Sequence, residues 1–306
     1  MRAWTAIPRG FRTRVERLLP EWWWVWLHQL REIGVDRRFT AGQALLHAYP
    51  ELAAPADPQT AFNRSECRVY SQNGEDGILL YLFSRIGTTD RRFVEFGIGD
   101  GSECNTANLA LTFGWRGLLL EADPSLAARA REFYAGRPTL RTSSLQIENV
   151  RVEPDTIDEV LGRFGVRGEL DLLSIDIDGN DYWVWKAADA ISPRVVAIEY
   201  NASFGPSRAV TVPYRRGFDR YAEHASGYYH GASLRALDEL ARRKGYLLAG
   251  CDSRGSNAFF VREDAAAGRI EPVSVEDAFF PLYERAHSSV EDQFRTIEHL
   301  DLVEVA

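Results

Sequence analysis

The stretch Phe93-Val94-Glu95-Phe96-Gly97-Ile98-Gly99-Asp100-Gly101 joins an apolar run to a cluster of glycines. This pattern predicts a buried strand and a sharp turn into a helix, because glycine adopts backbone conformations that a side chain forbids. A dinucleotide-binding turn has the spacing Gly-x-Gly-x-x-Gly, with a pyrophosphate at the start of the next helix. Here the third glycine comes one residue early and Asp100 lies inside the turn. Asp100 and Glu95 would repel a pyrophosphate but suit a ligand that carries an ammonium or sulfonium group.

A second apolar run, residues 117–121 (Gly-Leu-Leu-Leu-Glu), ends in a carboxylate twenty residues after Gly101. A carboxylate at the end of the second strand can accept hydrogen bonds from both hydroxyls of a ribose. The glycine turn, its two acids and Glu121 together favour S-adenosylmethionine as the ligand.

Strands and helices alternate along most of the chain. Helices are predicted near residues 74–86, 126–134, 156–164, 182–188 and 234–243. Strands are predicted near residues 92–96, 117–120, 139–145, 170–175, 195–198, 246–248 and 258–261. The alternation predicts right-handed β-α-β units. The expected fold is α/β: a Rossmann-like, doubly wound, mostly parallel seven-stranded sheet with helices on both faces.

On these residues the chain resembles the class I methyltransferases, whose first motif is an acid-x-Gly-x-Gly-x-Gly turn. More narrowly, it resembles the FkbM-type and related sugar O-methyltransferases. The resemblance covers about residues 68–262 and is carried by residues 70–79 (YSQNGEDGIL), 93–101, 117–123 and 174–179 (SIDIDG). It implies a set of cofactor-binding residues: Gly97, Gly99 and Gly101 along the cofactor, Glu121 at its ribose, Ser143 and Ser144 beside its adenine, and Gln72 near its methionine end.

Acidic residues follow two further predicted strands, at positions 176–181 (Asp-Ile-Asp-Gly-Asn-Asp) and 199–201 (Glu-Tyr-Asn). Because the carboxyl ends of parallel strands meet at one edge of a sheet, both groups should face one crevice beside the sulfonium. Carboxylate and amide oxygens suit Mg²⁺ or another divalent cation. Asp178, Glu199 and Asn201 are therefore candidate metal ligands and Asp176 is a candidate catalytic residue. Alternatively, the same acids bind the cofactor amine or the substrate directly, and Asp181 is the N-cap of the next helix.

Candidate substrate contacts lie in the irregular segments after the fifth strand. Tyr214 and Tyr229 are expected at the acceptor pocket, because loops in this position usually shape it in this fold. His230 is the candidate general base, since imidazole titrates near neutral pH. The alternative for His230 is a loop histidine with only a structural hydrogen bond. Ser233 is expected to cap the helix that follows.

Charge and composition narrow the class of protein. The 306 residues include 36 Lys and Arg against 44 Asp and Glu, and the net charge of −8 argues against a nucleic-acid partner. Three cysteines are too few for a disulfide framework or a zinc site, which favours the cytoplasm. No run of about 20 apolar residues is present that would span a bilayer.

The amino-terminal region differs in charge from the rest of the chain. Residues 1–38 carry eight arginines and four acids, and they include the cluster WWWVWL at 22–27. We expect a Trp/Arg-rich helical arm and linker at 1–60, a methyltransferase domain at 61–265, and a C-terminal extension at 266–306 that packs on the domain. The arm either packs on the domain or on a second subunit, as in a homo-oligomer, or makes peripheral contact with a membrane.

The sequence thus predicts a cytoplasmic S-adenosylmethionine-dependent methyltransferase. Its expected substrate is a sugar or glycosylated small molecule that it O-methylates, with a divalent cation as a candidate helper. Two alternatives stay open: a non-catalytic protein of this fold that uses its Trp-rich arm to dock on a membrane or partner, and a nicotinamide oxidoreductase, which the early third glycine disfavours.

Overall fold

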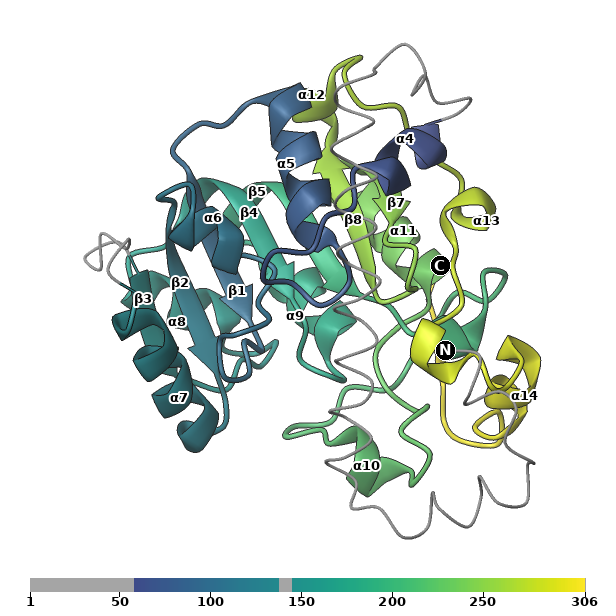
Figure 1. The fold of residues 1–306 in the computed structure, drawn as a ribbon. Coiled ribbons are helices and arrows are strands. Elements are labelled where there is room, and N and C mark those ends of the chain that lie inside the picture. Colours follow the sequence, from purple (N-terminus) through teal and green to yellow (C-terminus); the bar gives the residue numbers. More distant parts are fainter. Residues whose placement is uncertain (1–57, 138–144, 306) are drawn as a thin grey trace, which may run out of the picture. The chain divides into compact units, whose positions relative to one another are not determined.

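The structure is a computed structural model that describes residues 58–137 and 145–305 (Figure 1). The predicted arm lies outside the described residues except for 58–60. Those three residues begin the helix α4 (Pro58–Arg64) and are not part of a linker. The predicted adenine contacts Ser143 and Ser144 also lie outside the described residues.

The described part of the chain contains a seven-stranded sheet with the order β3-β2-β1-β4-β5-β8-β7. The strands are β1 (Arg92–Phe96), β2 (Arg116–Glu121), β3 (Leu145–Asn149), β4 (Gly168–Ile175), β5 (Ile191–Glu199), β7 (Tyr246–Cys251) and β8 (Asn257–Arg262). Strands β1 to β5 are parallel, and β8 is antiparallel to both β5 and β7. The predicted fold class is therefore confirmed. The strand order reverses between β1 and β4, where ligands bind in open α/β sheets.

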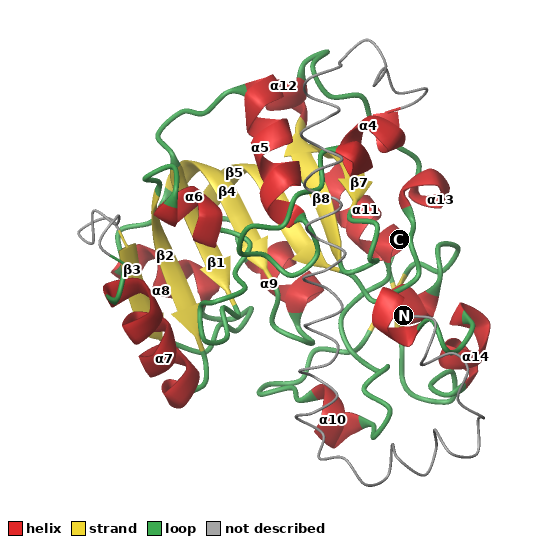
Figure 2. Ribbon diagram, in the orientation of Figure 1, coloured by secondary structure: helices red, strands yellow, loops and turns green. Residues whose placement is uncertain are grey.

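Helices cover both faces of the sheet (Figure 2). One face carries α4, α5 (Glu75–Ile86), α6 (Ala107–Leu111), α7 (Pro124–Ala135) and α12 (Glu263–Ala266). The other carries α8 (Ile157–Arg163), α9 (Asp181–Ala187), α11 (Leu234–Arg243) and α13 (Val275–Ala278). Alternate residues of β5 explain this arrangement, since Val196 and Ile198 pack into one core cluster and Val195 and Ala197 into the other.

Local sequence patterns predicted a helix cap correctly but misplaced the third strand of the sheet. The side chain of Ser233 accepts a hydrogen bond from the Ala236 backbone N–H and caps α11, as expected. Strand β3 starts at Leu145, where the prediction ended. Most of its residues are only half buried because it lies at the edge of the sheet, so its apolar pattern is weak. No described helix is both long and apolar enough to cross a membrane.

The C-terminal residues pack on several elements of the domain. Helix α13 contacts α11 and β7, and α14 (Val290–Arg295) contacts the 3₁₀ helix η3 (Ala202–Phe204). Strand β9 (Val303–Glu304) pairs with β6 (Val210–Thr211) in a separate two-stranded sheet. The last elements of the chain are thereby held against the segments that follow β5.

A buried ion pair fixes the start of the central strands. Asp171 on β4 is fully buried and lies 3.1 Å from Nη1 of Arg194 on β5. The Asp171 carboxylate also accepts hydrogen bonds from the backbone N–H groups of Thr89, Asp90 and Arg91. The loop before β1 is therefore tied to β4 and β5.

Replacing Asp171 should destabilise the fold strongly. Asp171→Ala leaves a buried guanidinium and three backbone N–H groups without their carboxylate, and we expect the unfolding free energy to fall by about 3–5 kcal/mol. The matched control is Asp189→Ala, because the Asp189 side chain is 77% exposed and pairs with Lys244 at the surface. That loss should be about 0–1 kcal/mol. Urea unfolding measures both values, and equal losses would contradict the assigned role of Asp171.

Candidate functional site

The three glycines of the turn after β1 serve different purposes. A Cβ on Gly97 would lie 1.6 Å from the backbone oxygen of Asp176, so the turn passes directly against the end of β4. A Cβ on Gly101 would lie 2.9 Å from the ring of Tyr134 on α7, which makes Gly101 a packing position. Gly99 has φ +55°, and a Cβ there would meet no other atom within 4 Å, so its open side faces free space. Gly97 and Gly99 line a pocket that Gly101 does not reach.

The two acids of the turn hold the turn itself. Glu95 is buried, and its carboxylate accepts hydrogen bonds from the backbone N–H groups of Asn105 and Thr106. Asp100 accepts hydrogen bonds from the backbone N–H and hydroxyl of Ser102, and the hydroxyl bond lowers the pKa of Asp100. Neither residue lines the pocket. This placement differs from the prediction that both acids contact the cofactor.

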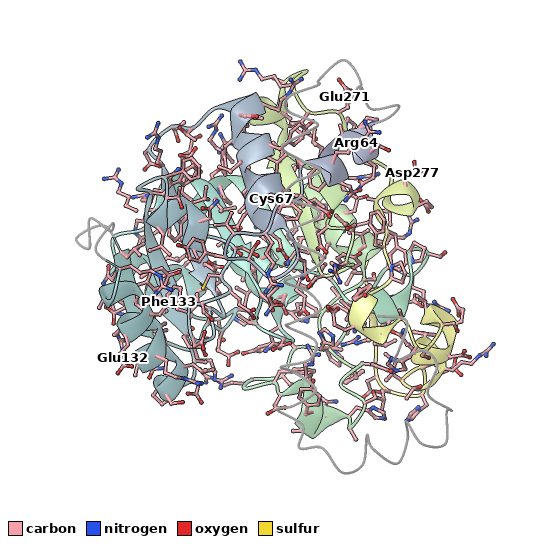
Figure 3. The ribbon with its side chains drawn as sticks, in the orientation of Figure 1. Arg64, Cys67, Glu132, Phe133, Glu271 and Asp277 are labelled. Atoms are coloured by element: carbon pink, nitrogen blue, oxygen red, sulfur yellow. The ribbon has the colours of Figure 1, made fainter. Side chains whose placement is uncertain are left out.

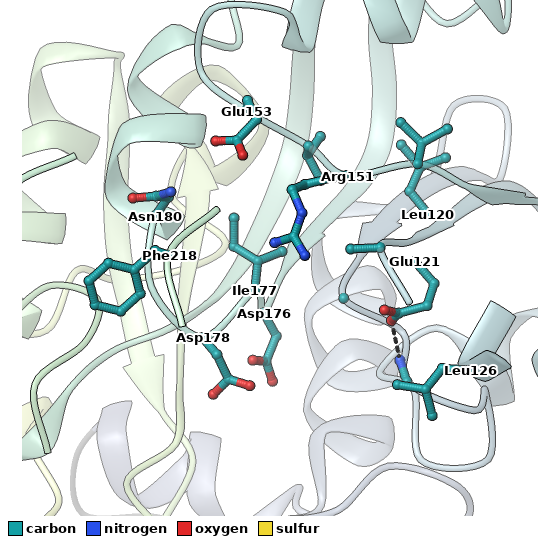
Figure 4. Close-up of a pocket in the computed structure, with 15 residues that line it drawn as sticks. Leu120, Glu121, Leu126, Arg151, Glu153, Asp176, Ile177, Asp178, Asn180 and Phe218 are labelled. Carbon is teal, nitrogen blue, oxygen red and sulfur yellow. Dashed lines mark hydrogen bonds between the residues drawn. The ribbon is translucent and has the colours of Figure 1, made fainter. Parts of the chain in front are cut away.

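Glu121, at the end of β2, reaches the open glycine. Its Oε2 accepts a hydrogen bond of 2.8 Å from the Gly99 backbone N–H, drawn as a dashed line in Figure 4. Its Oε1 accepts one of 2.8 Å from the Asp123 backbone N–H. Each carboxylate oxygen has a second lone pair, so Glu121 can still accept hydrogen bonds from a ligand. The carboxylate therefore lies where a ribose-binding acid is expected.

The pocket lies at the carboxyl ends of β1, β2, β3 and β4 and has a volume of about 210 Å³. It is lined by Gly97, Gly99, residues 120–122, Leu126, residues 150–153, residues 176–178, Asn180 and Phe218. Figure 4 shows the Arg151 side chain extending into the space beside Glu121 and Ile177. Drug-sized ligands usually occupy pockets of about 300–1,000 Å³. The pocket is therefore smaller than a nucleoside ligand needs. It can hold one when exposed side chains at its mouth, such as that of Arg151, move aside.

Four carboxylates gather at the ends of β4 and β5, and we call Asp176, Asp178, Asp181 and Glu199 the acidic cluster. Burial, together with the charges of Asp178 and Asp181, raises the pKa of Asp176 well above its usual value. Burial and the charges of Asp176 and Asp178 do the same to the pKa of Glu199. Burial raises the pKa of Asp181 to about 6. The acidic cluster thus holds its negative charge at a cost in stability and favours a positively charged ligand.

Asp181 shapes the loop that carries the cluster. Its two carboxylate oxygens accept hydrogen bonds of 2.8 Å from the backbone N–H groups of Ile177 and Gly179. Asp178 between them adopts φ +56°, a conformation that Asp tolerates better than most residues. Helix α9 begins at Asp181 and its N-cap is Asn180, so Asp181 is not the N-cap.

Arg220 on the short helix α10 (Arg220–Glu223) brings a positive charge to two of these acids. Its guanidinium forms an ion pair with Asp178, and its Nη1 lies 3.9 Å from Oε1 of Glu199. The Arg220 side chain is 18% exposed. In this structure a guanidinium therefore balances the charge of Asp178 and Glu199.

His230 lies behind Glu199 and away from the pocket lining. Its ring is 2% exposed, and Nδ1 lies 3.6 Å from Oε2 of Glu199. Nε2 lies 3.2 Å from Nη2 of Arg285, in the 3₁₀ helix η4 (Tyr283–Arg285). Burial and the charges of Arg220 and Arg285 lower the pKa of His230 well below 6.5. The expected base is thus a buried neutral imidazole whose Nε2 is already in contact with a donor.

The predicted metal ligands do not all converge. Ligand atoms of Asp178, Glu199 and His230 lie within 4.8 Å of one another, whereas Asn201 is not in this group. The Asn201 oxygen accepts a hydrogen bond from the Ser203 backbone N–H, and its amide donates to the carbonyls of Tyr228 and His230. This corrects the expected role of Asn201, which holds the loop around His230.

Other predicted contacts lie at different distances from the pocket. Tyr214 is partly exposed, and its one hydroxyl proton is shared between the carboxylates of Glu153, a pocket residue, and Asp155. Tyr229 is buried in a core cluster, and its hydroxyl donates to the Asp301 carbonyl, which corrects its expected role as a substrate contact. Gln72 is exposed and donates to Glu103 outside the pocket lining.

Arg151, Arg220 and Arg285 are residues of the site that the sequence did not point to. Each belongs to a segment without a recognisable motif, and each reaches the site through tertiary contacts. The sequence shows three basic residues close together at Arg215, Arg216 and Arg220, but they lie more than 30 residues after the acidic stretch.

Fold and site together define a class of protein. A mostly parallel sheet with a glycine turn after β1, a carboxylate at the tip of β2 and acids after β4 and β5 is the arrangement of an S-adenosylmethionine-dependent methyltransferase. Comparison with protein families gives the particular family. Residues 57–248, more than half of the chain, match the methyltransferase FkbM domain, and the chain belongs to this family.

Comparison with solved structures finds distant resemblances. The O-methyltransferase TomG from Streptomyces achromogenes, involved in tomaymycin synthesis and solved with S-adenosylmethionine, is 17% identical over 74% of this chain and 96% of its own, with a TM-score of 0.40. A candidate sarcosine dimethylglycine methyltransferase from Galdieria sulphuraria is 16% identical over 56% of this chain, with a TM-score of 0.38. The chain spans 60% of the length of that protein. No curated protein matches the sequence. The chain's membership of the family follows from the match over residues 57–248 alone.

The acidic cluster should make stability depend on pH. A carboxyl whose pKa is raised in the folded state binds its proton more tightly there, so its stabilising effect is complete below its unfolded pKa near 3.8 and is lost as pH rises through the folded value. We expect the melting temperature to fall between about pH 6 and pH 8, because below this range the lowered pKa of the buried His230 acts in the opposite direction. Asp176→Asn should reduce this fall and stabilise the protein at pH 8, because it removes a buried charge that its neighbours repel.

The control for this prediction is an acid outside the cluster. Glu271 is exposed and is labelled at the periphery in Figure 3, so Glu271→Gln should leave the pH dependence unchanged. Thermal unfolding across the pH range compares the three proteins. A steeper pH dependence for Asp176→Asn than for the wild type would contradict the repulsion among these acids.

Proposed function

We propose that this methyltransferase O-methylates a hydroxyl of a sugar or glycosylated small molecule, with assistance from a divalent cation. The observation that carries the proposal is the contact between Glu121 and the open glycine Gly99, next to a cluster of acids at the same edge of the sheet. The pocket between them offers hydrogen-bond acceptors for a ribose and negative charge for a sulfonium.

The chain would act mainly by binding and orientation. S-adenosylmethionine supplies a methyl group on a positively charged sulfur atom. Glu121 would hold the ribose, and Asp176 would stabilise the positive charge near the methyl group. Positioning of reacting groups can lower a barrier by about 7–11 kcal/mol. A nearby carboxylate that accepts the hydroxyl proton adds about 10²–10⁴-fold. Glu199 fits this role because burial and neighbouring acids raise its pKa.

Asp178 and Glu199 would hold the cation, since carboxylate oxygens suit Mg²⁺ and Mn²⁺. A bound cation would lower the pKa of a coordinated hydroxyl. Arg220 pairs with these carboxylates in this structure. A divalent cation therefore fits only when Arg220 moves away, because two positive charges at one site repel each other.

The acceptor class is supported by polar groups near the pocket. Glu153 lines the pocket and Tyr214 donates a hydrogen bond to it, so both can meet the hydroxyls of a saccharide. The net charge of −8 disfavours nucleic acid as a substrate. We also propose that the chain associates with itself, that its arm contacts a membrane, and that it works in the cytoplasm. Three free cysteines favour the cytoplasmic location.

Binding of S-adenosylhomocysteine tests the cofactor site. We expect the wild type to bind it in the micromolar range by calorimetry. Gly99→Ala should weaken binding at least about tenfold, or about 1.4 kcal/mol, because the new methyl group enters the pocket. The matched control is Gly114→Ala, since Gly114 also has a positive φ and open space around it but lies outside the pocket lining.

Two results would count against this prediction. If the folded wild type does not bind S-adenosylhomocysteine, the proposed function is contradicted. Equal affinities of Gly99→Ala and the wild type would place the ligand elsewhere. Comparison with Gly114→Ala separates loss of binding from the backbone strain that both substitutions introduce.

Titration with Mn²⁺ tests the cation. Arg220→Met should bind Mn²⁺ severalfold more tightly than the wild type, because it removes the competing positive charge. Asp178→Asn in the Arg220→Met background should reverse this gain, since it removes a carboxylate ligand. Electron paramagnetic resonance measures free Mn²⁺ in each titration. Absence of bound Mn²⁺ in both the wild type and Arg220→Met would exclude cation assistance at these acids.

A further inference from the structure

The contact between Arg285 and His230 decides which ring nitrogen carries the proton. Nη2 of Arg285 lies 3.2 Å from Nε2 of His230. A guanidinium has only donors, so Nε2 must accept this hydrogen bond. A neutral imidazole has one donor and one acceptor nitrogen. The proton of His230 is therefore on Nδ1.

Arg285 cannot easily turn away from this position. Its Nη1 donates to the Ser203 hydroxyl at 2.9 Å, and its Nη2 also donates to the Gly227 carbonyl at 3.2 Å. The guanidinium lies over the ring of Tyr228, 4.9 Å from its centroid. Arg285 itself is only 7% exposed. The direction of its N–H group toward His230 is thus set by several contacts from different segments.

We propose that Arg285 is a positioning residue that holds His230 as the Nδ1–H tautomer, so that His230 presents a hydrogen-bond donor toward Glu199. In this tautomer Nδ1 has no free lone pair for a metal ion or for a substrate proton. His230 is then neither the general base nor a metal ligand. Under the proposed function, on which this step rests, Glu199 remains the proton acceptor and Asp178 and Glu199 remain the cation ligands.

Two buried atoms at this place have complementary needs. Nδ1 of His230 and Oε2 of Glu199 lie 3.6 Å apart, and neither has a hydrogen-bond partner among the described residues. A hydroxyl group is at once a donor and an acceptor, so it satisfies both atoms. Neither residue lines the pocket, so the acceptor hydroxyl of the proposed function does not reach these atoms here, and the group that fits between them is a buried water molecule.

Nitrogen NMR of the ¹⁵N-histidine-labelled full-length protein tests the tautomer without any substrate. The six histidines give separate signals, and His230→Gln identifies those of His230 by their loss. We expect the wild type to show protonated Nδ1 and unprotonated Nε2 at His230. Protonated Nε2, or a doubly protonated ring at neutral pH, would overturn the proposal even if S-adenosylhomocysteine binds as expected.

Variants of Arg285 test the cause. Arg285→Met removes the donor, and we expect the His230 signals to shift toward a mixture that includes the Nε2–H tautomer. Arg285→Lys keeps a donor and should retain the Nδ1–H form. Arg295→Met is the matched control, because Arg295 is 70% exposed and pairs with Asp292. An unchanged tautomer in folded Arg285→Met would overturn the role of Arg285, and if that variant does not fold, the wild-type spectrum and Arg285→Lys decide.

Discussion

Repulsion among carboxylates at the carboxyl edge of the sheet is the constraint on which the site depends. Parallel strands β4 and β5 end side by side, and they bring Asp176, Asp178 and Glu199 together with Asp181. Burial and like charge raise the pKa of Asp176 and Glu199, so the acids place the site under electrostatic strain. The protein offsets this strain with the largely buried Arg220 and with backbone N–H groups that bind Asp181. A positively charged ligand relieves it further, which couples ligand binding to stability.

The source of the negative charge differs from the one that the glycine turn suggested. Glu95 and Asp100 bind backbone N–H groups of the turn and of the residues after it, and neither side chain lines the pocket. Their contribution is to hold Gly99 where its N–H meets Glu121. The charge that a sulfonium would meet comes mainly from the ends of β4 and β5. The turn therefore sets the shape of the pocket, and the acidic cluster supplies its negative electrostatic potential.

The sequence predicted what depends on short stretches of chain. The glycine turn, the strands at 92–96 and 170–175 and the cap at Ser233 all follow from local patterns, and together they define the fold. The positions of pocket residues were predictable where these residues end or directly follow strands, as with Glu121 and Asp176. It was not predictable where a role depends on tertiary partners. Nothing in the sequence near Asn201 or Tyr229 shows that their polar atoms bind loop backbone, or that Arg220 reaches Asp178 from 42 residues away.

The C-terminal extension gives the clearest case of such dependence. The family match ends at residue 248, yet Arg285 contacts His230, Ser203 and Gly227 within the domain. A histidine beside a carboxylate ordinarily suggests a base, because its neutral form has a free lone pair. A guanidinium at the far nitrogen removes that option, since it fixes which nitrogen accepts. The chemistry of the site is therefore set jointly by the matched domain, which places the acids, and by the extension, whose Arg285 makes the imidazole beside Glu199 a donor.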